Sequence, residues 1–295
     1  MSDDSRTVTI HGRDFQQLSI DERIYCAPVA NDDREEERLT TQHEILRRLF
    51  GDAILSPAVR LNNPTKVLDC GYGGGDWAVE FAEDYEDCEV TGLDIYPLRL
   101  VDQPDNLDLV GYNLNDRLND PEVFQLRAYD LIHSRFIAPG IKRNRWTPYF
   151  RDMRTLLRPG GNIQVAEYQL HVQSYSGRLT TQSAVYRWWQ AYASAMRELN
   201  RDPRIGPSLK EKVEAAGFRD VQFEYKRLPI GNWEQDSLLA SIGQDSVVLV
   251  GDLLESYGLW PFTSHLGWTI AQFDYLIEQI RVELQTVELK LYLPM

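Results

Sequence analysis

The chain has 295 residues, of which 43% are hydrophobic and 11% aromatic, so it can form one α/β domain with insertions around a sizeable core. Its formal net charge of -14 argues against a surface that follows nucleic-acid phosphates, and no nucleic-acid partner is expected. The three cysteines are an odd number without paired spacing, which indicates neither a disulfide framework nor a metal site.

The amino terminus shows no secretory signal, because Met1 to Ile10 is polar and acidic. The longest apolar runs, such as Val247 to Val250, are too short to cross a bilayer. A soluble protein of the cytoplasm, or of the nucleus, with no membrane partner is therefore expected.

Strands and helices alternate from residue 66 onward, which predicts a parallel sheet. Before them, charged residues lead into an apolar-periodic helix around Ile45 and Leu49. The helices expected between the strands are residues 76–85, 149–157 and 209–216. The expected strands are residues 66–70, 89–94, 107–112, 129–133, 162–167 and 221–228.

Two mostly helical insertions interrupt this alternation, at about 172–206 and 230–286. Insertions at the carboxyl ends of parallel strands usually form lids or substrate walls. Phe136, Trp189 and Trp233 are therefore the expected walls of an acceptor pocket.

A glycine-rich turn follows the first of these strands, in Asp69-Cys70-Gly71-Tyr72-Gly73-Gly74-Gly75. Glycine lets a backbone turn tightly and approach a ligand without a Cβ in the way. A dinucleotide fingerprint requires the spacing G-x-G-x-x-G. Here glycines recur at every second residue after an acidic one, which is typical of motif I of class I S-adenosylmethionine-dependent methyltransferases.

An acidic residue, Asp94, ends the next strand, where an α/β fold places the carboxylate that accepts hydrogen bonds from ribose hydroxyls. Its neighbour Ile95 and the Asn113-Leu114 pair after the third strand are candidates to surround the adenine. Together with the glycine loop, Asp94 predicts a cofactor site.

The sequence as a whole resembles the fungal LaeA-like branch of class I methyltransferases, a group associated with secondary metabolism. The likeness covers nearly the full chain. Besides the glycine loop it includes Glu37-Arg38-Leu39, Tyr129 to Arg135 with its His-Ser-Arg end, Leu157 to Gly161, and Pro229-Ile230-Gly231-Asn232-Trp233.

This resemblance implies a Rossmann-like seven-stranded sheet with a helical N-terminal extension and helical lid insertions. Residues 1–60 are expected to cover the cofactor site, and residues 61–295 to form the cofactor-binding domain. The implied cofactor is S-adenosyl-L-methionine, with S-adenosyl-L-homocysteine as product.

The resemblance also assigns roles within the site. Asp69, Gly71 and Gly73 are expected near the methionine moiety, with Asp94 on the ribose and Asn113 and Leu114 near the adenine. It places His133 opposite the donor, and Tyr25 either closes over the cofactor or packs as a buried aromatic residue. Where the acceptor needs a base, His133 is the first choice, since imidazole titrates near neutral pH, and Glu167 is the second.

Two features depart from the family pattern. Tyr72 and Asp76 stand where the family usually has a small and an apolar residue, which changes the shape of the methionine pocket. Near the carboxyl end, either Val287 to Leu293 is the seventh strand, or that strand is missing and an exposed sheet edge favours a homodimer.

The sequence thus predicts a methyltransferase that acts on a small-molecule acceptor, a fungal secondary metabolite, by in-line methyl transfer. Two alternatives use the same cofactor site: a regulatory or scaffold protein without turnover, and a catalyst of a rearrangement that uses the charged sulfonium. A nicotinamide-dependent oxidoreductase fits the fold, but the glycine spacing argues against it.

Overall fold

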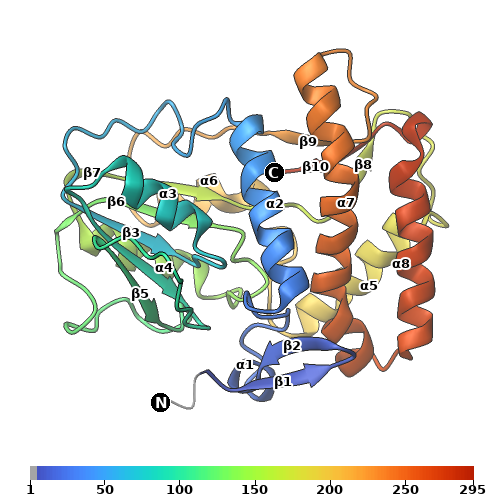
Figure 1. The fold of residues 1–295 in the computed structure, drawn as a ribbon, viewed down its shortest axis with the longest axis horizontal. Coiled ribbons are helices and arrows are strands. Elements are labelled where there is room, and N and C mark those ends of the chain that lie inside the picture. Colours follow the sequence, from blue (N-terminus) through green and yellow to red (C-terminus); the bar gives the residue numbers. More distant parts are fainter. Residues whose placement is uncertain (1–4) are drawn as a thin grey trace.

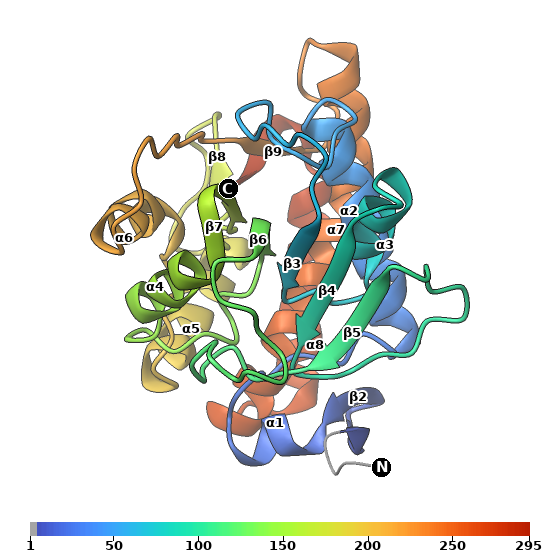
Figure 2. The same ribbon diagram turned by 90° about the vertical axis from the view of Figure 1, so that its left-hand side faces the viewer.

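The computed structural model describes residues 5–295 and contains a five-stranded parallel sheet in the order β5-β4-β3-β6-β7 (Figures 1 and 2). Its central strands are almost wholly buried, because helices cover both faces. The strands are β3 (Lys66–Cys70), β4 (Glu89–Asp94), β5 (Leu107–Gly111), β6 (Tyr129–Arg135) and β7 (Leu157–Ala166).

Helices pack on the two faces of this sheet, as Figure 2 shows. The alternating side chains of β3 divide between the two layers: Val67 packs with Trp77 of α3, and Leu68 packs with Trp146 of α4. The flanking helices are α2 (Asp33–Leu49), α3 (Asp76–Asp84), α4 (Trp146–Leu156) and α6 (Leu209–Ala215).

A second, helical layer lies beyond α2 and contains the largest cluster of buried residues (Figure 1). It consists of α5 (Ala184–Glu198), α7 (Ser237–Trp260) with a π-helical end η3 (Pro261–His265), and α8 (Ile270–Gln285). The segment Ser237–His265 is long and apolar enough to span a membrane by length and composition alone. Here α7 packs against α2, α8 and β9 as a core helix.

Three short antiparallel strands form a separate sheet in the order β8-β10-β9. They are β8 (Gln173–Ser174), β9 (Arg227–Ile230) and β10 (Leu291–Pro294). The expected α/β class is confirmed, but the sixth and seventh strands pair here and not in one seven-stranded sheet. The segment 221–226 is mostly exposed and forms no strand. The expected sixth strand is therefore shortened to β9, which pairs with β10 along its length.

The N-terminal extension begins with a hairpin that sequence periodicity did not predict, β1 (Thr7–Ile10) and β2 (Arg13–Gln16), followed by α1 (Gln17–Asp21). Short 3-10 turns, η2 (Gly206–Ser208) and η4 (Val287–Leu289), precede α6 and β10. The predicted turn at Pro159–Gly161 lies within β7, at a register shift relative to β6.

Candidate active site

The glycine loop connects β3 to α3 and requires glycine at its first position. Gly71 has a φ of +85°, and its amide donates to the carbonyl of Leu93 at 2.7 Å. A Cβ on Gly71 would lie 2.3 Å from Cγ2 of Ile137, so a side chain there collides with the opposite wall. Glycine is therefore required at this position by both the backbone conformation and the close approach of Ile137.

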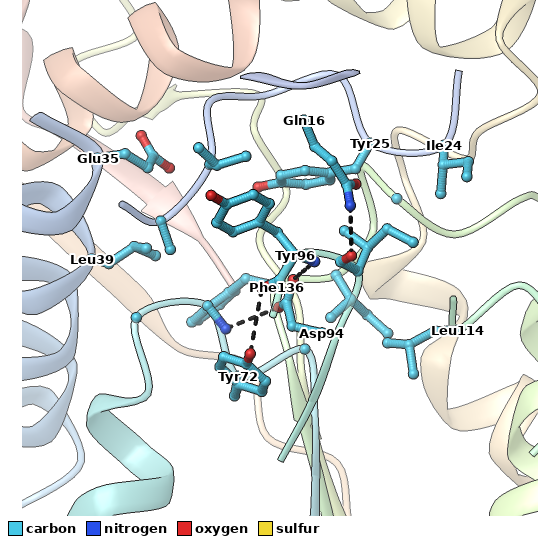
Figure 3. A pocket seen from close by; sticks show the side chains of 18 of the residues that line it. Gln16, Ile24, Tyr25, Glu35, Leu39, Tyr72, Asp94, Tyr96, Leu114 and Phe136 are labelled. Carbon is cyan, nitrogen blue, oxygen red and sulfur yellow. Dashed lines mark hydrogen bonds between the residues drawn. The ribbon is translucent and has the colours of Figure 1, made fainter. Parts of the chain in front are cut away.

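Asp94 at the end of β4 holds this loop in place (Figure 3). Its Oδ2 accepts a hydrogen bond from the Gly73 amide at 3.0 Å, and its Oδ1 accepts one from the Tyr96 amide at 3.2 Å. Burial raises the pKa of Asp94 to about 6, because these two bonds offset only part of the desolvation. Each oxygen keeps lone-pair capacity for a further hydroxyl donor.

Tyr72, one of the departures from the family pattern, braces the same loop. Its hydroxyl accepts from the Leu98 amide at 2.8 Å and donates to the carbonyl of Tyr96 at 3.4 Å. The buried ring lies beside Gly92, where a Cβ would approach Tyr72 Cδ1 to 2.9 Å. The large side chain therefore ties the glycine loop to the turn that follows β4.

A crevice of about 1010 Å³, including its mouth, opens above these residues. We call it the cofactor crevice. It is lined by eight of the predicted site residues, namely Tyr25, Gly71, Gly73, Asp94, Ile95, Asn113, Leu114 and Phe136. It lies at the carboxyl ends of the parallel strands, as expected for this fold.

The N-terminal extension supplies the opposite wall of the crevice, with Gln16, Tyr25 and Leu39 among its lining residues (Figure 3). The Gln16 side chain donates to the carbonyl of Ile95 at 2.8 Å, which ties β2 to the turn after Asp94. Tyr25 lies over Asp94 in this view, so both expected roles of Tyr25, lid and packing residue, fit its position.

A buried ion-pair network fixes the start of α2 beside the crevice. Arg38 donates to Glu35 at 2.6 Å, and Arg13 donates to Asp32 at 2.8 Å. Ser256 of α7 also donates to Glu35, at 2.7 Å. The wall from the extension is thereby joined to the helical layer.

His133 and Asp69, both predicted site residues, lie beneath the crevice and do not line it. The His133 Nδ1 atom lies 2.7 Å from Asp69 Oδ1, and both side chains are almost fully buried. The imidazole stacks on Trp77 with a centroid distance of 3.8 Å. Burial lowers the pKa of His133, so the neutral ring donates its Nδ1 proton to the carboxylate.

Glu167, the second predicted base, also lies outside the lining of the crevice. Its two oxygens accept from the amides of Ile137, at 2.9 Å, and Ala138, at 3.3 Å. Burial raises the pKa of Glu167 to about 8. The geometry makes Glu167 an anchor for the turn after β6 that forms the crevice wall.

The two predicted tryptophan walls lie elsewhere. Trp189 is 1% exposed and stacks on His171 with a centroid distance of 5.1 Å. Trp233 donates its indole proton to the carbonyl of Leu291 at 2.8 Å, beside the small antiparallel sheet. The structure therefore groups neither of them with Phe136 at the crevice.

Several lining residues were not predicted from the sequence. Arg135 ends β6, and Tyr257 enters the crevice from the last turn of α7. Arg135 belongs to the His-Ser-Arg segment and was detectable by its position after a strand. Gln16, Glu35 and Tyr257 carry no such signal, because only tertiary packing of the extension and of α7 brings them to the site.

A parallel sheet with a glycine loop after one central strand and a carboxylate at the end of its neighbour defines a nucleoside-cofactor-binding α/β protein. Comparison with known proteins refines this class. Residues 41–223 match the family model described as a methyltransferase domain. The chain therefore belongs to the methyltransferase domain family, and it is an S-adenosylmethionine-dependent methyltransferase.

Similar proteins include the secondary metabolism regulator laeA of Monascus pilosus, 28% identical over 266 residues, which are 88% of this chain and 69% of that protein. Methyltransferase pytC of Aspergillus terreus is 27% identical over 257 residues, 87% of this chain and 77% of that protein. The phosphoethanolamine N-methyltransferase 2 of Haemonchus contortus, solved with S-adenosyl-L-methionine, gives a TM-score of 0.44 at 16% identity. That comparison covers 88% of this chain and half (50%) of that chain.

Proposed function

We propose that this protein transfers the methyl group of S-adenosylmethionine to a small organic acceptor, a fungal secondary metabolite, held next to the cofactor crevice. The observation that carries the proposal is the hydrogen bond from the Gly73 amide to the Asp94 carboxylate. The donated hydrogen bond fixes both the loop and the carboxylate that would receive the ribose hydroxyls. S-adenosylmethionine supplies an electrophilic methyl group on a positively charged sulfur.

A small acceptor is supported by a second, partly open pocket that shares Phe136 and Tyr257 with the crevice. Its other lining residues combine aromatic and apolar side chains with a few polar groups, as small-molecule sites do. They are Ala138, Pro139, Glu167, Tyr168, Leu170, Tyr192, Met196, Arg201, Asp202 and Pro203. Phe136 and Tyr257 would thus lie where the donor and acceptor spaces meet.

The residues at the crevice favour catalysis by alignment. In the described part of the chain no histidine lines the crevice. Methyl transfer gains most from holding the reacting atoms in line and from excluding water. The extension that carries Gln16 and Tyr25 would exclude water, and Phe136 would position the acceptor.

Asp76 at the first turn of α3 gives a further argument against a nicotinamide cofactor. A dinucleotide places its pyrophosphate at this helix end. Asp76 lines the crevice there, and its negative charge repels a pyrophosphate. An amino-acid-bearing nucleoside does not meet this repulsion.

Calorimetric titration tests the donor, and transfer of a labelled methyl group tests the acceptor. We expect binding of S-adenosylmethionine and S-adenosylhomocysteine, no binding of a nicotinamide dinucleotide, and label in small molecules of a fungal metabolite extract. Asp94→Ala is the matched control, with label and affinity both lost. Tight binding with label absent from every small product would instead favour a regulatory protein or a non-methylating catalyst.

A further inference from the structure

Arg135 is a cation of the crevice that forms no salt bridge within the described residues, although the carboxylates of Asp69 and Asp76 attract it from farther away. Among residues 5–295 it is the only basic residue that lines the crevice, and no carboxylate lies within salt-bridge distance of it. Its Nη2 atom donates to His43 Nδ1 at 3.0 Å. Burial lowers the pKa of Arg135, but a guanidinium remains protonated at any pH at which the protein is folded.

A neutral histidine orients this guanidinium. His43 Nε2 lies 2.6 Å from Glu80 Oε2, and a carboxylate can only accept, so the ring proton is on Nε2. The bare Nδ1 is then free to accept from Arg135. Glu80 is held in turn by Arg47, at 3.0 Å. Arg135 is thereby fixed in direction while its positive charge stays available to a ligand.

Among the described residues, three carboxylates line the same crevice, and two of them already have charged or backbone partners within the protein. Glu35 is paired with Arg38, and Asp94 accepts two backbone amides. Within residues 5–295, Asp76 accepts only from the Thr40 hydroxyl, at 3.1 Å. Asp76 and Arg135 are therefore the two charged groups of the crevice that have one neutral partner each.

We infer that Arg135 and Asp76 clamp the zwitterionic amino-acid tail of the donor, Arg135 taking its carboxylate and Asp76 its ammonium group. The inference rests on the proposed function. With the ribose on Asp94 and the adenine at Leu114, the tail leads away past the glycine loop. Asp76 and Arg135 both lie against α2, because Asp76 accepts from Thr40 and Arg135 donates to His43, about one helical turn further on. Together they present one positive and one negative group to the crevice, which matches an α-amino acid.

His43 is a positioning residue in this arrangement, since it acts through Arg135 and does not itself line the crevice. The acidic residue Asp76 at the first turn of α3 thus acquires a function beyond its favourable interaction with the helix dipole.

Four ligands and two variants separate the two contacts. The ligands are S-adenosylhomocysteine, its decarboxylated analogue, its deaminated analogue, and 5′-methylthioadenosine, which lacks the tail. We expect Arg135→Met to weaken the two carboxylate-bearing ligands roughly 10- to 100-fold and to leave the other two unchanged. Asp76→Asn should weaken only the two amine-bearing ligands, by roughly tenfold or more.

Matched controls are Arg117→Met, whose side chain is 77% exposed, and Asp84→Asn at the other end of α3, and neither should change any affinity. His43→Leu should weaken only carboxylate-bearing ligands, and should have no effect in the Arg135→Met background. Equal weakening of all four ligands by Arg135→Met would show a merely structural role and overturn the inference. Unchanged S-adenosylhomocysteine affinity with lost methyl transfer would overturn it too, and would assign Arg135 to an acidic acceptor.

The wild-type protein distinguishes the two levels of failure. If it binds none of the four adenosyl ligands, the proposed function fails, and the clamp fails with it. If it binds S-adenosylhomocysteine but the variants do not discriminate among the ligands, only the clamp is wrong.

Discussion

The imidazole of His133 donates to the Asp69 carboxylate across 2.7 Å, and the pair is sealed between the glycine loop and Trp77. Asp69 precedes the glycine loop, so His133 acts on the crevice only through the strand that carries the loop. A buried carboxylate without its donor is strongly destabilising.

Two replacements of His133 separate a structural role from a catalytic one. Asparagine keeps a donor for Asp69, whereas phenylalanine keeps the stack on Trp77 and leaves the carboxylate unpaired. We expect His133→Asn to lower the free energy of unfolding by about 1–2 kcal/mol and His133→Phe by about 3 kcal/mol. Chemical denaturation at pH 7 measures both. Full stability combined with lost methyl transfer in His133→Asn would identify His133 as a base after all.

Asp94 makes donor binding depend on pH. Its pKa of about 6 means that the free site is increasingly protonated below that pH, while ribose hydroxyls are best accepted by the ionised form. We expect the affinity for S-adenosylhomocysteine to fall by up to about tenfold per pH unit below pH 6. Titrations from pH 5 to 8 test this, and in Asp94→Asn the affinity should be weak and flat. An equally steep profile in that variant would exclude Asp94 as the titrating group.

Ionisation of Asp94 favours donor binding, but it lowers the stability of the ligand-free protein. Its pKa is raised from 3.8 to about 6, so its contribution to stability is complete below pH 3.8 and is lost as the pH rises through about 6. We therefore expect the effect of Asp94→Asn on the unfolding free energy of the ligand-free protein to be more favourable at pH 7 than at pH 4. The change in unfolding free energy between the two pH values, compared with wild type, gives the result.

Trp189 shows where sequence patterning misplaces a residue. It lies off the apolar stripe of its helix, yet it is buried between His171 and Arg204. We expect Trp189→Ala to cost about 3–5 kcal/mol of stability and to leave donor affinity unchanged in the folded protein. The control is Tyr275→Ala on α8, which is 61% exposed and should stay within about 0.5 kcal/mol of wild type. A loss of methyl transfer without loss of stability or of donor affinity would restore Trp189 to the acceptor pocket.

The parallel sheet was predictable because its strands are short apolar runs that alternate with amphipathic helices. The β3 and β4 boundaries match the prediction, and Gly71 and Asp94 were identified by their place at strand ends. Such signals are local. The chemistry of a strand-to-helix turn is set by residues that are neighbours in the sequence.

The rest depends on contacts between distant segments. The β1–β2 hairpin is four residues per strand, and Tyr257 reaches the crevice from a helix whose sequence predicts only burial. The strand expected at 221–228 forms only from Arg227, because its pairing partner β10 meets it there. Alternation in a sequence indicates the capacity to pair, and the partner decides where pairing begins.

Gly71 provides the sharpest steric test of the crevice. Its φ of +85° and the 2.3 Å approach of a Cβ to Ile137 Cγ2 mean that alanine adds both backbone strain and a collision. We expect Gly71→Ala to cost about 1–3 kcal/mol from strain alone and to weaken S-adenosylhomocysteine at least tenfold. Gly177→Ala is the control: its φ is +66°, and nothing lies within 4 Å of its Cβ, so donor affinity should not change.

Removal of the colliding methyl group then distinguishes the two effects. In Gly71→Ala combined with Ile137→Ala, the collision is gone and the backbone strain remains. Thermal unfolding and titration of the two single variants and the double variant complete the cycle. We expect the double variant to regain part of the affinity lost in Gly71→Ala, because the opposing wall can then admit the added Cβ. Strictly additive losses would show that Ile137 does not cause the loss of affinity in Gly71→Ala, and that the backbone conformation of Gly71 alone causes it.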